Sequence, residues 1–154
     1  MAPSRATRDT QAMSDPYELQ RFVDAQAPVY PRVLEEVRAG RKTSHWMWFV
    51  FPQLAGLGFS PMAQRFALAS LDEARAYLDH PTLGTRLIEC TDLVLDIKSR
   101  TVVEIFGSPD DLKFRSCMSL FARAADDPAL FNEALDQFFE GVPDPKTEAL
   151  LGPP

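Results

Sequence analysis

The chain has 154 residues and a mass of 17.3 kDa, and 45% of its residues are hydrophobic, which is enough for one domain with a single core. Acidic residues outnumber basic ones by 22 to 16, and the net charge of −6 argues against general nucleic-acid binding, which needs a basic face. No stretch approaches the roughly 18 consecutive apolar residues of a membrane helix, and residues 1–15 lack the apolar segment of a secretion signal. We therefore expect a soluble, cytoplasmic monomer without a membrane partner.

The first 14 residues are polar and aperiodic, which predicts a flexible extension before a single helical domain over residues 15–151. In that domain, prolines that follow a residue able to cap a helix mark helix starts. Proline suits the first helical position because its missing N–H would be unpaired there, and the preceding side chain accepts another free N–H. The pattern occurs at Asp15-Pro16, Ser60-Pro61, His80-Pro81, Ser108-Pro109, Asp127-Pro128 and Asp144-Pro145.

Two further helix starts, Ser70 and Thr101, are followed three residues later by glutamate, which is the pattern of a capping box. Gly40, Gly107 and Gly141 follow periodic segments and predict helix ends. Between these marks the apolar residues recur at helical spacing, most clearly over 30–37, 83–97 and 130–138. Because no segment shows the sustained alternation of a strand, the sequence predicts an all-α fold of about seven or eight mostly short helices.

Residues 46–51 form the densest apolar run and contain both tryptophans. Their residue types favour a strand, but a lone strand would have no partner for its backbone groups. We therefore expect a buried helical turn or two that ends at Pro52, apolar all round because other helices surround it.

The sequence lacks the motifs of several common metal-binding and catalytic sites. The chain has no HExxH motif, no cluster of histidines and cysteines at metal-binding spacing, and no GxSxG nucleophile motif. We expect neither a metal nor a cofactor, and no catalytic residue can be named. Cys90 and Cys117 lie inside apolar helical patterns and are expected to be buried, reduced thiols.

The aromatic run belongs to a larger set of residues at fixed intervals, which matches a known family. The matching segments are Leu19-Gln20-Arg21-Phe22, Ala25-Gln26, Lys42, Ser44-His45-Trp46-Met47-Trp48-Phe49, Phe51-Pro52-Gln53, Gly56-Leu57-Gly58, His80-Pro81, Leu83-Gly84, Phe106-Gly107, Asp111, Lys113, Leu120-Phe121, Gly141, Asp144 and Thr147. On these residues the chain resembles, from about Asp15 to Leu151, the small bacterial family catalogued as domain of unknown function 1810. The resemblance implies a compact all-α domain and no particular reaction. Members often carry the label calpastatin, but a calpain inhibitor is expected to be disordered, whereas this chain is predicted to pack.

Polar residues at the aromatic run are the first candidates for a ligand site. Lys42 and His45 precede Trp46 and Trp48, whose indoles would form a stacking wall for a ligand with a polar or anionic group. The alternative is a core histidine beside core tryptophans. Both interpretations stay open at this point.

Two glutamines and a polar line on a later helix extend this candidate site. Gln26 shares a helical stripe with apolar residues, and an unpaired buried carboxamide would cost about 1 to 3 kcal/mol. It therefore either ties helices together or lines a cavity, and Gln53 has the same two interpretations. Lys113 and Ser116 are spaced at three residues and form either an ordinary solvated helix edge or a second wall of the site.

Three hypotheses for function follow from these residues. The first is a domain that binds a small polar or anionic ligand or a peptide, at a site lined by Gln26, Lys42, His45, Trp46, Trp48, Gln53, Lys113 and Ser116. The second is a hydrolase or transferase on a phosphate- or ribose-bearing substrate, with His45 as the acid or base. The third is a structural or protein-interaction module in which the aromatic run is only core.

Overall fold

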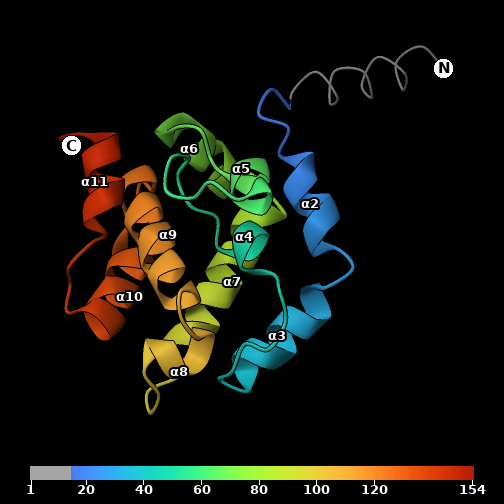
Figure 1. Ribbon diagram of the computed structural model, residues 1–154, viewed down its shortest axis with the longest axis vertical. Helices are drawn as coiled ribbons and strands as arrows, with labels where there is room; N and C mark the ends of the chain where they lie inside the picture. Colours follow the sequence, from blue (N-terminus) through green and yellow to red (C-terminus); the bar gives the residue numbers. More distant parts are fainter. Residues whose placement is uncertain (1–14) are drawn as a thin grey trace.

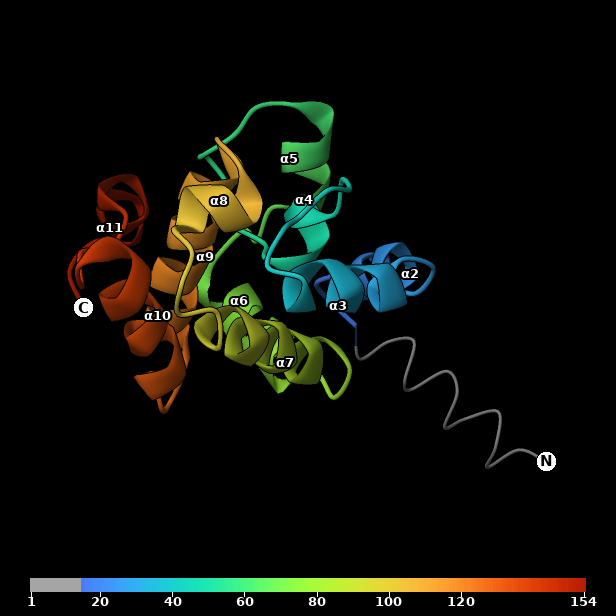
Figure 2. The same cartoon turned by 90° about the horizontal axis from the view of Figure 1, so that it is seen from below.

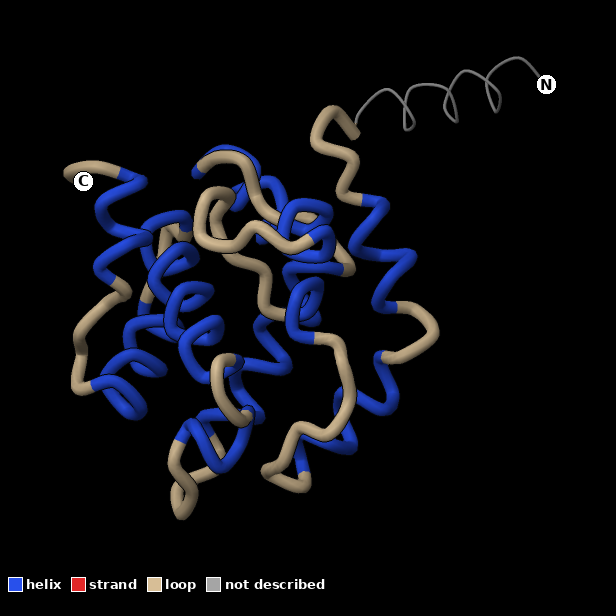
Figure 3. The backbone as a smooth tube through the Cα atoms, viewed as in Figure 1, coloured by secondary structure: helices blue, strands red, loops and turns tan. Residues whose placement is uncertain are grey.

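The computed structural model describes residues 15–154, so the extension predicted over residues 1–14 lies outside the described residues. Ten helices form in the described part of the chain, and no strand forms there (Figures 1 and 3). They are α2 (Gln20–Gln26), α3 (Tyr30–Arg38), α4 (Met47–Val50), α5 (Pro61–Phe66), α6 (Leu71–Asp79), α7 (Leu83–Leu95), α8 (Val102–Phe106), α9 (Asp110–Ala124), α10 (Ala129–Phe139) and α11 (Pro145–Leu151). Seven of the ten have seven or more residues, and the all-α prediction is confirmed.

Helix α9 is the longest element, with 15 residues, and it organises one half of the domain. It packs against α6, α8, α10 and α11, while α7 packs against α3, α6 and α10. Figures 1 and 2 both show α2 and α3 on one side of the molecule and α10 and α11 on the opposite side. The short helix α4 contacts both α2 and α5, so the aromatic run lies among other helices.

The aromatic run forms the buried helical turn that its sequence predicts. Helix α4 spans four residues, and the flanking Trp46 and Phe51 have exposed fractions of only 1% and 0%. The Phe51 ring meets Phe106 and Phe114 edge to face, with ring centroids 5.7 and 5.1 Å away. These contacts join the run to α8 and α9, so its apolar part is explained by the core.

Four of the eight predicted helix starts are confirmed at the level of single hydrogen bonds. Ser60, Ser70 and Asp144 each accept the backbone N–H of the third helical residue, and Thr101 forms the complete capping box with Glu104. At the other four predicted starts the helix begins later than expected, since α2, α7, α9 and α10 begin at Gln20, Leu83, Asp110 and Ala129. The Ser108-Pro109 peptide is cis, α9 begins only at Asp110, and no side chain caps it.

The loop that leads into α4 is held by a buried carboxylate. Glu36 on α3 has an exposed fraction of 7%, and its oxygens accept hydrogen bonds from Thr43 N (2.7 Å), Ser44 N (2.9 Å), Ser44 Oγ (2.6 Å) and Trp46 Nε1 (2.9 Å). Burial alone would raise the pKa of Glu36, but the hydrogen bonds outweigh it and lower the pKa from 4.5 to about 2. This carboxylate therefore fixes the backbone over 43–46 and, through the indole, the position of Trp46.

Candidate functional site

A groove of about 420 Å³ opens between the segment after α4, the first turns of α9 and the start of α11. We call it the Trp48 groove. Its lining residues are Trp48, Gln53, Leu57, Gly58, Pro109, Leu112, Lys113, Ser116, Asp144, Pro145 and Lys146. Four of the residues predicted for the site, Trp48, Gln53, Lys113 and Ser116, thus lie together although they come from segments about 60 residues apart.

Lys113 stands between an aromatic ring and a carboxylate. Its Nζ lies 3.6 Å from the centroid of the Trp48 ring and 3.1 Å from Asp110 Oδ1. The other oxygen of Asp110 binds Lys42 Nζ at 2.8 Å, and Lys42 in turn lies 5.2 Å from the Trp46 ring centroid. One aspartate therefore connects two lysine–tryptophan pairs.

The two lysines stabilise the ionised form of Asp110. Burial alone would raise its pKa, but hydrogen bonds from Lys42 and Lys113 outweigh burial and hold the pKa below its ordinary value of 3.8. The Lys42 side chain is only 8% exposed and does not line the groove. Lys42 therefore lies behind the groove wall and supports Asp110, which positions Lys113 over Trp48.

The opposite wall of the groove is fixed by Asp144. Its Oδ2 accepts from Thr147 N (3.1 Å) and Thr147 Oγ1 (2.6 Å) and lies 3.0 Å from Ser116 Oγ. The Asp144 backbone N–H donates to Ser119 Oγ at 2.8 Å. Together these bonds attach the start of α11 to α9, which explains why the polar line on α9 faces α11 as well as the groove.

Gly58 has to be glycine for the groove to keep its shape. A Cβ at this position would lie 2.9 Å from the Cβ of Ala63 and 3.7 Å from Gln53 Nε2. The loop backbone therefore passes close to α5 and to the Gln53 amide. That amide forms no hydrogen bond with any other described residue, although Gln53 lines the groove.

The remaining predicted site residues lie elsewhere. Gln26 is 1% exposed, and its carboxamide bonds to Phe49 O (2.6 Å), Tyr77 Oη (3.1 Å) and Arg86 Nη1 (3.2 Å), so it ties α2 to α4, α6 and α7. Trp46 is 1% exposed and does not line the groove. His45 is exposed in the turn before α4 and is not part of the groove lining.

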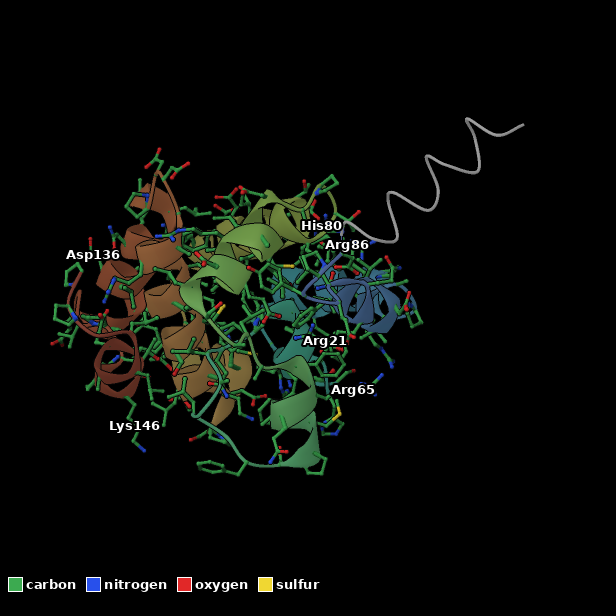
Figure 4. The ribbon with its side chains drawn as sticks, turned by 90° about the horizontal axis from the view of Figure 1, so that it is seen from above. Arg21, Arg65, His80, Arg86, Asp136 and Lys146 are labelled. Atoms are coloured by element: carbon green, nitrogen blue, oxygen red, sulfur yellow. The ribbon has the colours of Figure 1, made fainter. Side chains whose placement is uncertain are left out.

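Sequence reasoning missed Asp144 and Lys146 as groove residues. Asp144 was recognised only as a helix cap, and Lys146 is an exposed residue without an ion-pair partner among the described residues. Figure 4 shows Lys146 extending outward from the start of α11. No local signal reveals that the start of α11 borders the same groove as Trp48, because these segments are almost 100 residues apart in the sequence.

Membrane insertion, metal binding and thiol chemistry each need a recognisable feature within residues 15–154. No helix there is long and apolar enough to cross a membrane, and no three His, Cys, Asp or Glu side chains are grouped to hold a metal ion. Cys90 and Cys117 are buried and unpaired with each other, as predicted. Burial raises the pKa of the Cys90 thiol to about 11, so at neutral pH it is protonated and a poor nucleophile.

Comparison with known proteins shows the family of the chain and agrees with its fold. The model of the family described as "Protein of unknown function (DUF1810)" matches residues 16–151, and the chain belongs to this family. A similar solved structure is that of the conserved hypothetical protein Rv1873 from Mycobacterium tuberculosis. It has 58% sequence identity to this chain, covers 89% of this chain and 98% of its own, and has a TM-score of 0.88. No curated protein matches the chain.

Proposed function

We propose that the chain binds a small ligand with a polar or anionic group in the Trp48 groove. The observation that carries the proposal is the convergence of Trp48, Gln53, Lys113 and Ser116 on one concave site. A volume of about 420 Å³ is within the range of small-molecule sites, which combine apolar walls with a few fixed polar groups. Leu57 and Leu112 supply apolar wall, and Lys113 is held in place before any ligand arrives.

Unused hydrogen-bonding capacity supports the same proposal. Most polar side chains around the groove are paired, as is usual for buried groups. The Gln53 amide and the Lys146 ammonium have no partner among the described residues, and both border the groove. A bound ligand would give these two groups a partner, and a preorganised wall would lower the entropy lost on binding.

The test is a ligand titration read by two signals. Nucleotides, phosphorylated sugars and amino acids are titrated while Tm and tryptophan emission are recorded. We expect one class to raise Tm and to change the emission, because Trp48 lines the groove. Trp48→Phe should remove the emission change and keep the Tm shift, since the buried Trp46 remains as the only reporter.

Matched lysine variants make the test specific to the groove. Lys113→Met should weaken binding about tenfold or more, because the positive charge held over Trp48 in the groove lining is lost. Asp110 keeps Lys42 as its partner in that variant, so the fold should persist. Lys98→Met removes an exposed lysine outside the groove and should bind like the wild type. Equal affinity of both variants, or no shift with any class, would contradict the proposal.

A further inference from the structure

The Trp48 groove presents unpaired charges of both signs. On the positive side, Lys42 and Lys113 are already paired with Asp110, so Lys146 is the lysine at the groove that lacks an acidic partner in the described chain. On the negative side, Asp144 uses only Oδ2 for Ser116 and Thr147. Its Oδ1 accepts no hydrogen bond from the described residues and is not among the buried unpaired atoms, so solvent reaches it.

This pair of charges selects against ligands of a single sign. A ligand that is only anionic would place its charge beside the Asp144 carboxylate, and a ligand that is only cationic would meet Lys146 and Lys113. Juxtaposed like charges are unfavourable, and interfaces use them to reject wrong partners. A ligand that carries an ammonium and a carboxylate offers a partner to both the Asp144 carboxylate and the Lys146 ammonium.

We infer that the ligand of the Trp48 groove is a small zwitterion with an apolar side chain, that is, an α-amino acid of the leucine, methionine or phenylalanine kind. This inference rests on the proposed function and names its ligand class. The ammonium donates to Asp144 Oδ1, and the carboxylate accepts from Lys146. The side chain packs against Leu57 and Leu112, which line the same groove. The Gln53 amide, which can both donate and accept, serves either charged group.

Calorimetric titration with three related probes tests the inference. L-leucine carries both charges, isocaproate lacks the ammonium, and isoamylamine lacks the carboxylate, while all three have nearly the same apolar part. We expect leucine to bind at least about tenfold more tightly than either analogue, because each analogue loses one charge-assisted contact. Methionine and phenylalanine are titrated in parallel and compared with their own deaminated acids.

Substitutions then test which side chain of the groove contacts each charged group of the ligand. Asp144→Asn keeps an oxygen for Ser116 and Thr147, so the cap survives while the negative charge is lost. This variant should bind leucine and isocaproate with equal affinity. Lys146→Gln should in turn bind leucine and isoamylamine equally, and Lys98→Gln, outside the groove, should retain the full preference for leucine. Circular dichroism and Tm confirm that each variant is folded.

The outcomes separate this inference from the proposed function. If isocaproate binds as tightly as leucine to the wild type, or if only nucleotides or sugar phosphates bind, the zwitterion is ruled out and the groove remains a ligand site. If amino acids bind but Asp144→Asn keeps its preference for leucine over isocaproate, the assignment of the ammonium to Asp144 is overturned. If nothing in either set binds the folded protein, both proposals fail.

Discussion

Gly84→Ala should destabilise the protein by about 3 kcal/mol, because this position has no room for a side chain. A Cβ on Gly84 would lie 1.9 Å from the carbonyl oxygen of Leu78 and 2.8 Å from its carbon. The obstacle is the backbone at the end of α6, which cannot rotate away as a flexible side chain would. Urea unfolding of the wild type and the variant, followed by circular dichroism, measures the difference in free energy of unfolding.

The expected loss of stability is opposite in sign to the usual effect of replacing glycine by alanine in a helix. Gly84 is the second residue of α7, and at helical positions alanine is ordinarily favoured over glycine, by roughly 0.5–1 kcal/mol in a helix interior. Without the steric conflict the variant would therefore be more stable. Gly152→Ala is the control, since its Cβ would meet open space and only the φ of +77° would be strained, at about 1–2 kcal/mol. A stabilised Gly84→Ala variant would show that α6 and α7 do not pack as closely as described.

Glu36→Gln should cost roughly 3 kcal/mol at neutral pH, the free energy that corresponds to lowering a pKa from 4.5 to about 2. The folded pKa lies below the unfolded pKa, so this stabilisation is fully present above about pH 4.5. It is lost as the pH falls through about 2, where the folded carboxyl group takes up a proton. Urea unfolding at several pH values between neutral and acidic conditions, for the wild type and the variant, tests both the size and the pH range.

Glu35→Gln is the matched control, because Glu35 is an exposed neighbour on the same helix. It should change stability by no more than about 0.5 kcal/mol, as surface substitutions usually do. The difference between the wild type and Glu36→Gln should narrow toward pH 2. A difference that persists unchanged at acidic pH would show that the amide is tolerated poorly for its shape, and the ionised carboxylate would then not be the stabilising species.

The structural features that could be predicted from the sequence are those that local interactions determine. Ser70 and Asp144 were identified as caps because a cap depends on residues within one helical turn. The helical turn within residues 46–51, which the structure forms at Met47–Val50, followed from the lack of a partner strand. Glu36 was not identified, because its four donors lie in an irregular loop seven to ten residues later, where no periodicity reports a contact.

The candidate site was predictable only in part, because residue types are visible in the sequence whereas contacts between distant segments are not. Trp48, Gln53, Lys113 and Ser116 were selected by residue type, and the fold brings them together. His45 was selected by its chemistry alone, and its turn places the ring in solvent. Lys146 was missed because only the packing of α11 against α9 gives an ordinary surface lysine a position at the groove.

The ion pairs of Asp110 with Lys42 and Lys113 also determine the electrostatic field near the groove. Lys42 and Lys113 share this one carboxylate, so their cluster keeps one unit of positive charge within a chain whose net charge is −6. An anion approaching from solution is therefore repelled at long range and attracted only near the wall, whereas a molecule without net charge meets no such barrier. Added salt, which screens the long-range field beyond about 10 Å at 0.1 M, should accordingly speed the association of anions and leave that of zwitterions nearly unchanged.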